Sequence, residues 1–518
     1  MLSVFGALVL FVCIFMLRSR RVQVIITFII YGLDEGGIES LNELGRVYFF
    51  KERGYAPGEA QRSITLTDLS WQIKASFALV MDCVPILGYH YRPYLLFVGI
   101  LGTAGYATIA AIPNLVSDSV AVLLFFLGVN AMVWNDTALD GFTMQKIKEY
   151  PAVDQELPSL QQVGLMTTAI VFSFISGFLI EWVGLRWNYA LVALISAAAT
   201  IAGAMMPEKR KKNALKSSLA TFWTELRTIL SLFWLPPYLK MLVYVYLAAF
   251  NFDLTTAMVY WYEDVALYSK GFIGTISTVG WAVALIAVVI NATYFKKVSW
   301  RTLLIGFQLF AMAISALDLL LVCVAKDAFW GHFIALSDKA GSRAHAKLRF
   351  IVVQVAIADY LPETGETTAT AILAMFMNFA GGFCGGYAGS FLLDALNIEK
   401  GNYGNLPWAV LIRTLARLLP IPFIPFIIPA GCSADKIHVD ASDILKTDGD
   451  AAAANGTENG DEKALELSPV SSNSTAQIVV NRVPEPERTG SLSSSSSSFN
   501  EFFVASNTDD VDDDDFDY

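Results

Sequence analysis

Charged residues and cysteines are both scarce in this sequence of 518 residues. Asp, Glu, Lys and Arg make up 16% of the chain and hydrophobic residues 55%, an apolar fraction above that of ordinary soluble domains. The five cysteines are far apart, with no C-x-x-C pair, and the chain has four histidines. These numbers and spacings argue against a disulfide framework or a zinc site. No nucleophile and base pattern indicates an enzyme, so we expect no catalytic residues, no metal and no cofactor.

Acidic charge is concentrated at the C-terminus. The formal net charge is −11, but residues 431–518 contain 19 Asp and Glu against 5 Lys and Arg, a net of −14, which leaves +3 for residues 1–430. The tail contains the strings SLSSSSSSF and VDDDDFDY. Such a composition cannot bury enough apolar surface to offset the entropy lost on ordering. We therefore predict a disordered acidic tail over 431–518.

Long apolar segments occupy most of residues 22–430. A helix that crosses the bilayer core needs about 20 mostly apolar residues, because its backbone polar groups must be satisfied within the helix. Twelve segments meet this condition: 22–50, 65–86, 93–112, 117–141, 160–183, 186–206, 236–262, 271–295, 300–325, 347–362, 366–396 and 405–430. We therefore predict an all-α membrane protein with about twelve transmembrane helices.

Lys and Arg gather in alternate connections between these segments, which predicts that the 207–235 connection and the tail lie in the cytoplasm. The connection after the ninth segment is an exception. Four basic residues there would face outward: Lys339, Arg343, Lys347 and Arg349.

The long 207–235 connection separates two groups of six segments, so we expect one six-helix bundle from 22–206 and another from 236–430. Similar strings end the first segment of each half, VYFFKE at 47–52 and VYWYED at 259–264. Aromatic belts at a membrane face would give such strings without any repeat. Together with the six-plus-six count, the strings favour two related bundles with a site between them.

The first 21 residues begin with a further apolar run. Its charged residues follow the run, unlike those of a secretory signal peptide. We expect an uncleaved segment or an interfacial helix there.

Charged residues inside the predicted spans are the candidate functional residues, because a charge at membrane depth is costly unless it faces a cavity or a partner. Acids outnumber bases among them: Asp34, Glu35, Glu39, Glu43, Arg46, Lys74, Asp82, Asp136, Asp140, Asp253, Asp318 and Asp359. The excess of acids suits coupling to protons or cations. Some of these residues could instead form ion pairs that hold helices together.

Several segments carry a family resemblance. LSWQIKASFALVMDCVPILGYHYRPYLLFVGILG, at 69–102, contains Lys74, Asp82 and Arg92 in a pattern that resembles the folate–biopterin transporter family of the major facilitator superfamily. NDTALDG at 135–141 is similar to the family's pair of acids four residues apart. Further similar segments lie at 158–181, 251–274 and 361–389.

Two departures from the family pattern leave the substrate open. The connection between the second and third spans has His90, Tyr91 and Arg92 where family members often have several Arg residues. Ala75 and Ser76 stand where a Pro commonly follows the Lys.

The resemblance implies the major facilitator fold and secondary active transport of folate, biopterin or a related pterin. A folate has a flat hydrogen-bonding ring and an anionic glutamate, so its site needs aromatic surface, an acid or amide for the ring N–H groups, and a base for the carboxylates. We predict that Lys74 meets a carboxylate and that Asp136 or Asp140 meets the ring.

The remaining candidate residues are assigned by their position. Asp253 is a further candidate for substrate binding, and Asp82 and Arg92 are candidates for the inner gate because they lie at the membrane edge. Three acids are candidates for coupling to protons: Asp34, Glu39 and Asp359.

Two other functions stay open. The protein could transport another solute, such as a sugar, a nucleoside or S-adenosylmethionine, or it could be a non-transporting receptor or scaffold. Charges at membrane depth favour a transporter, because a scaffold has no need of them. We expect a monomeric multi-pass protein of the lipid bilayer, with the plasma membrane favoured over an organellar one, a small-molecule substrate, protons as the coupling ion and no nucleic acid partner.

Overall fold

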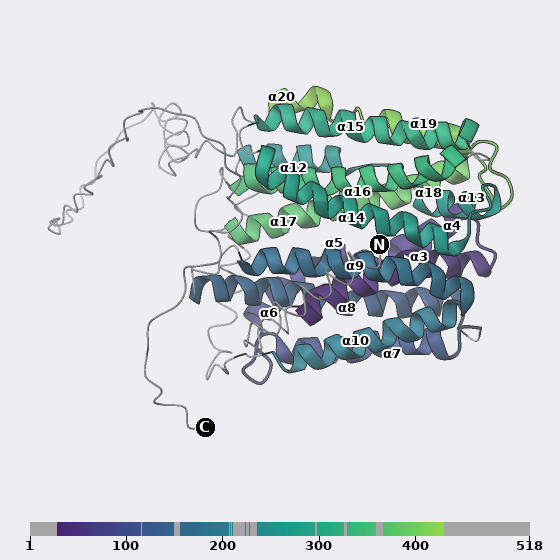
Figure 1. Ribbon diagram of the computed structural model, residues 1–518. Helices are drawn as coiled ribbons and strands as arrows, with labels where there is room; N and C mark the ends of the chain where they lie inside the picture. Colours follow the sequence, from purple (N-terminus) through teal and green to yellow (C-terminus); the bar gives the residue numbers. More distant parts are fainter. Residues whose placement is uncertain are drawn as a thin grey trace, which may run out of the picture. The chain divides into compact units, whose positions relative to one another are not determined.

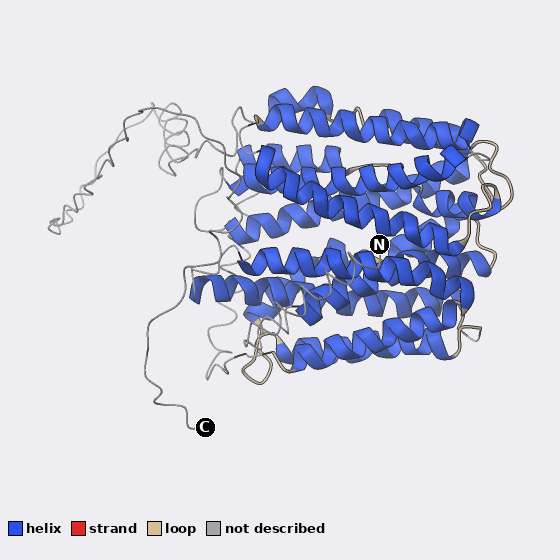
Figure 2. Cartoon of the chain, viewed as in Figure 1, coloured by secondary structure: helices blue, strands red, loops and turns tan. Residues whose placement is uncertain are grey.

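Helices account for nearly all of the described structure, as Figure 1 and Figure 2 show. The computed structural model describes residues 28–114, 116–149, 156–206, 208, 210, 223, 227, 236–295, 298–325, 329–358 and 366–428. The chain divides into two units, 1–450 and 451–518, and all described residues belong to the first. Four predicted features lie wholly or mostly outside the described residues: the 1–21 segment, the 207–235 connection, the 431–518 tail and Asp359.

The first half of the chain forms six helical rods. In the first rod, a π-helical segment η1 (Phe28–Ile38) continues directly into α3 (Glu39–Glu52). The second rod consists of α4 (Pro57–Thr67), α5 (Leu69–Gln72) and α6 (Lys74–Cys83). The other four are α7 (Arg92–Ala111), α8 (Asp118–Glu149), α9 (Glu156–Trp182) and α10 (Leu185–Ala204).

The second half forms six more rods. The seventh rod is α12 (Pro236–Ala249) and α13 (Thr255–Asp264), followed by α14 (Lys270–Tyr294). The ninth is α15 (Trp300–Leu320) with η4 (Leu321–Ala325), and the tenth is α16 (Phe329–Ala358). The last two are α17 (Glu366–Asn378) with η5 (Phe379–Cys384) and α18 (Gly385–Ala395), and α19 (Leu406–Ala416) with η6 (Ile421–Phe423) and α20 (Ile424–Ile427).

Each half packs as a bundle, and Figure 1 shows the first half in purple and blue beside the second half in teal and green. In the first bundle α7 packs on α8 and α10, and in the second α16 packs on α14 and α15. The bundles meet where α9 packs on α14 and α4 on α18. The largest buried apolar cluster contains Tyr48 and Tyr189 of the first bundle and Tyr260 of the second, so the core continues across the interface.

Eight of the described helices are long and apolar enough to cross a membrane, so the chain is an integral multi-pass membrane protein. The first, second, seventh and tenth rods do not meet this test. These four rods carry several charged residues or contain a break. Both features indicate polar groups in the interior of the protein, where a break or a charge can be satisfied.

Two predicted spans begin in the wrong place. The second rod begins at Pro57 rather than at 65, and the tenth begins at Phe329 rather than at 347. The outward-facing basic connection was therefore a wrong prediction, since its four basic residues lie within α16. The physical reason is that acids of the first bundle face this part of α16, so a segment of low hydropathy can be buried.

The two bundles approach closely through glycines of α9 and α14. A Cβ added to Gly274 would lie 2.8 Å from the Cα of Gly177, which is closer than real Cβ contacts come. Small residues at a crossing point of this kind let two helix backbones touch.

We expect Gly274→Ala to lower the thermal unfolding temperature of the purified protein, because the new methyl group meets backbone and forces α14 away from α9. Overpacking of this kind costs about 1–3 kcal/mol. Gly306→Ala on α15 is the matched control, since a Cβ at Gly306 has open space around it and Ala favours helix by about 1 kcal/mol. Equal unfolding temperatures for the two variants would contradict this packing.

Candidate functional site

Three residues predicted to bind substrate lie together in the first bundle. The Lys74 Nζ atom lies 2.5 Å from Asp136 Oδ2 and 2.8 Å from Asp140 Oδ2. Lys74 begins α6, and the two acids lie one turn apart on α8. One cation thus faces two carboxylates. The second oxygen of Asp136, Oδ1, is buried without a hydrogen-bond partner among the described residues.

Two acids of η1 lie beside the triad. Asn135 of α8 donates a hydrogen bond of 2.8 Å to Asp34 Oδ2, so this predicted coupling residue is buried next to Asp136. Glu35 interacts electrostatically with Lys74 and Asp136, and also with Lys347 of α16. Glu35 is therefore within electrostatic range of both the triad and a base of the second bundle.

Acids of the first rod face bases of the tenth rod in an antiparallel order. Glu35, Glu39 and Glu43 are spaced by four residues on η1 and α3, and a second set is spaced by four on α16: Lys339, Arg343 and Lys347. Residues at this spacing share one face of a helix. We name these six residues the charge ladder.

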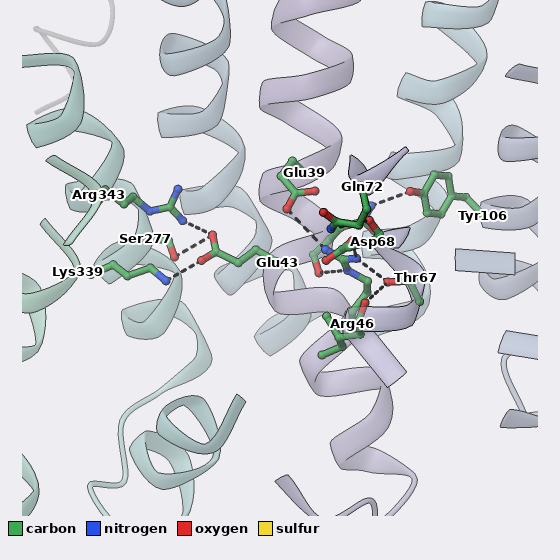
Figure 3. A network of polar contacts seen from close by, with 12 residues as sticks. Glu39, Glu43, Arg46, Thr67, Asp68, Gln72, Tyr106, Ser277, Lys339 and Arg343 are labelled. Carbon is green, nitrogen blue, oxygen red and sulfur yellow. Dashed lines mark hydrogen bonds and ion pairs between the residues drawn. The ribbon is translucent and has the colours of Figure 1, made fainter. Parts of the chain in front are cut away.

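Direct contacts are clearest at one end of the charge ladder. Glu43 Oε1 lies 2.8 Å from Lys339 Nζ, and Glu43 Oε2 pairs with the Arg343 guanidinium (Figure 3). Arg343 also interacts with Glu39, and Lys347 with Glu35. The ion pairs of Glu43 thus join the two bundles at this end of the charge ladder.

Residues of α14 complete this end of the charge ladder. The Ser277 hydroxyl donates to Glu43 Oε2 over 3.3 Å. The Arg343 guanidinium stacks over the Trp281 ring, with its Cζ atom 4.1 Å from the ring centroid. Gly280 lies between these two positions on α14, and the stems of Arg343 and Lys339 pass where a Cβ would be.

Arg46 is neutralised within the first bundle. Its guanidinium pairs with Asp68, donates to the Thr67 hydroxyl over 2.7 Å and lies 3.6 Å from Glu39 Oε1 (Figure 3). Glu39, a predicted coupling residue, therefore lies between Arg46 of its own bundle and Arg343 of the other. A carboxylate between two bases is a group whose charge depends on both neighbours.

Asp253 lies in the break between α12 and α13. Its carboxylate accepts hydrogen bonds of 2.9 Å from the Gln61 side chain and from the backbone N–H of Thr255. Its own N–H donates to the carbonyl of Gly385 over 3.0 Å. These contacts attach the start of α13 to α4 and α18, so Asp253 has a different set of partners from the Lys74 triad.

The predicted gate residues lie at the end of the bundles where α6 ends and α7 begins, which we name the inner end after the predicted orientation. The Tyr91 hydroxyl donates to Asp82 Oδ1 over 3.4 Å. Arg92 Nε donates to the carbonyl of Ala204 over 2.8 Å, and the Glu208 carboxylate accepts from the backbone N–H of Arg92 over 3.2 Å. Arg92 therefore ties α7 to the end of α10, and the gating role of both residues stays a prediction.

The two similar strings, 47–52 and 259–264, meet at the opposite end, which we name the outer end. Lys51 of the first string lies 2.6 Å from Glu263 and 2.7 Å from Asp264 of the second. Tyr403 donates to Asp264 over 2.6 Å. Lys51 and Glu263 occupy corresponding positions of the two strings, carry opposite charges and pair across the bundles.

The sequence did not predict that the bases of the charge ladder lie in the membrane. Their spacing of four residues was the signal that indicated one helical face. It also missed Arg413 of α19, which pairs with Asp318 of α15. The Asp318 side chain is 1% exposed. Its ion pair lies within one bundle, as expected if Asp318 holds two helices together.

Exchange of charges across the bundles tests the charge ladder. We expect Glu43→Arg to lower the free energy of unfolding by about 3 kcal/mol or more, since it places a third cation beside Lys339 and Arg343. Adding Arg343→Glu should recover most of the loss, because opposite charges face each other again. Thermal unfolding of the purified protein measures both.

The control for this exchange is Glu52→Lys, which disrupts a cross-bundle pair 3.5 Å long with Lys270. The Glu52 side chain in that pair is 53% exposed, so we expect a loss of about 1 kcal/mol or less. A Glu43→Arg protein as stable as this control, or a double variant less stable than Glu43→Arg, would show that the charge ladder does not join the bundles.

Comparisons with solved structures agree with the predicted architecture. The chain superimposes on a variant of the nucleoside transporter NupG with a TM-score of 0.60 at 12% identity, covering 79% of this chain and 100% of the other. It superimposes on a D-xylose-proton symporter with a TM-score of 0.56 at 14% identity, covering 79% and 97%. Likeness at this identity shows the fold alone, and it confirms the predicted major facilitator fold.

Comparisons of sequence show the family. A curated relative, "Probable folate-biopterin transporter 2" of Arabidopsis thaliana, is 25% identical over 419 residues, which are 78% of this chain and 82% of the relative. "Folate-biopterin transporter" of a Synechocystis species is 26% identical over 425 residues, 80% of this chain and 83% of the relative. The model of the BT1 family matches residues 36–447. The resemblance predicted from the sequence is therefore confirmed, and this chain belongs to the BT1 family.

Proposed function

We propose that this protein moves folate, biopterin or a related pterin across a membrane as a secondary active transporter. The names of its relatives support the substrate class. The observation that carries the proposal is the charge ladder together with the Lys74 triad, because it places costly charges between and within the bundles at membrane depth. A membrane scaffold has no use for them.

Within this proposal the Lys74 triad contributes the substrate site of the first bundle. The unpaired Oδ1 of Asp136 is an acceptor for N–H groups of a pterin ring. Lys74 meets one carboxylate of a folate, and Asp140, whose side chain is 43% exposed, is the more accessible of its two acids. Asp253, in the break of the seventh rod, contributes a further contact with the substrate.

Proton coupling uses carboxylates that have competing partners. Glu39 lies between Arg46 and Arg343, and Asp34 is held by Asn135 beside Asp136. A proton that neutralises such an acid releases its basic partner, which can then bind a substrate anion. Asp359 is the third coupling candidate of this proposal.

Alternating access requires pairs between the bundles to separate in turn. At the outer end Lys51 would leave Glu263 and Asp264, and Arg62 would leave Asp394. At the inner end Asp82 and Arg92 would act as the gate. We place the protein in the plasma membrane as a monomer, with the 207–235 connection and the 431–518 tail in the cytoplasm.

Uptake of labelled folate and biopterin by transport-deficient cells tests the function. We expect cells that express this protein to accumulate at least one of the two, and to do so faster with an inward proton gradient than without one. Cells that express an unrelated membrane protein are the control. Normal expression without uptake of either compound in either direction would refute the substrate class, and uptake insensitive to the gradient would refute proton coupling alone.

The Lys74 contact predicts a difference between substrates. Lys74→Met should lower folate uptake about tenfold or more, since truncation of one partner of a charged contact has an effect of that order. Biopterin has no carboxylate, so its uptake should fall much less. The amount of folded protein in the membrane should stay normal.

Equal losses for folate and biopterin would instead assign Lys74 a structural role. So would a Lys74→Met protein that fails to reach the membrane, because the change leaves the buried Asp136 without its base. Asp140→Asn with Lys74 intact is the matched control, since it preserves the pair between Lys74 and Asp136.

A further inference from the structure

The stacked pair of Arg343 and Trp281 holds two hydrogen-bond donors that lack acceptors. Arg343 Nε and Trp281 Nε1 are both buried without a hydrogen-bond partner among the described residues. Each group can only donate, and a buried donor without an acceptor is costly. Both donors belong to one stack, 4.1 Å from guanidinium carbon to ring centroid.

The local geometry keeps Arg343 Nε free of Glu43. The acid pairs with the Nη2 atom of the guanidinium and with Lys339, and Ser277 donates to the same acid. Glu43 therefore contacts Arg343 through Nη2 and not through Nε. Gly280 lets the stem of Arg343 lie across α14, with Nε 3.2 Å from the position of an added Cβ.

Two cations at this stack share one ion-paired acid. Lys339 and Arg343 both pair with Glu43, and the next acid of the charge ladder, Glu39, also interacts with Arg46 of its own bundle. A negatively charged acceptor therefore suits the open donors of Arg343 and Trp281 better than a neutral one.

We propose that Arg343 and Trp281 form an anion subsite on the second bundle that takes a carboxylate of the substrate. The inference rests on the proposed function and deepens it by giving the substrate an orientation. The carboxylate accepts hydrogen bonds from Arg343 Nε and Trp281 Nε1. Both carboxylates of folate belong to its glutamate, so one can lie at this stack while the other meets Lys74.

Equilibrium binding to the full chain in lipid nanodiscs tests the subsite, with folate as the carboxylate ligand and biopterin as the ligand without one. Trp281→Phe preserves the stacked ring but removes the N–H, and Arg343→Lys preserves the charge but removes Nε. We expect each variant to raise the Kd for folate about tenfold, and the Kd for biopterin by less than about twofold, as for loss of one hydrogen bond to a charged group. Trp408→Phe, at an exposed position on α19, is the control.

The outcomes separate this inference from the proposed function. Wild-type protein that binds neither ligand would overturn both. Wild-type protein that binds folate, with Trp281→Phe unchanged or with equal losses for folate and biopterin, would overturn the subsite alone. If Arg343→Lys lowers the folded yield, Trp281→Phe decides, because it leaves every ionic contact of the charge ladder in place.

Discussion

Charges held inside the membrane body of this protein depend on opposite charges close by. The energetic penalty for an isolated charge at that depth is large, and a paired charge avoids most of it. The charge ladder meets this constraint with acids on the first rod and bases on the tenth, each set repeated once per helical turn. Because the acids belong to one bundle and the bases to the other, the same pairs that make the charges tolerable also join the bundles.

Pairs at the outer end differ in exposure from one another. The Lys51 side chain is 8% exposed and its partners Glu263 and Asp264 are 29% and 25% exposed, which resembles the charge ladder, where Glu43, Lys339 and Arg343 are 19%, 24% and 16% exposed. Arg62 and Asp394 are more exposed, at 30% and 43%. Partly hydrated ion pairs contribute less free energy than desolvated ones, so under the proposed mechanism the pair of Arg62 and Asp394 separates at modest cost, whereas the pairs of Lys51 and of the charge ladder must exchange partners rather than lose them.

The two bundles are also unlike in local charge, although their folds correspond. Lys51 meets Glu263 and Asp264 because one string ends in Lys-Glu and the other in Glu-Asp. Lys74 pairs with two acids of its own bundle, whereas Lys339 and Arg343 pair with an acid of the other bundle. This asymmetry gives a physical basis for recognition of a molecule with distinct ends.

The sequence by itself determined the membrane architecture, because scarcity of charge and length of apolar runs are local properties. It also predicted Lys74, Asp136, Asp140 and Asp253 as one substrate-binding set, of which the structure brings the first three together and gives Asp253 other partners. Only the tertiary structure shows that the basic segment of α16 is a buried helix. Whether a basic segment is a loop or a buried helix depends on the acids that face it, and Glu43 is 300 positions from Arg343. A local pattern cannot contain that partner, so only the packing of the first bundle on the second shows that these bases lie inside the protein.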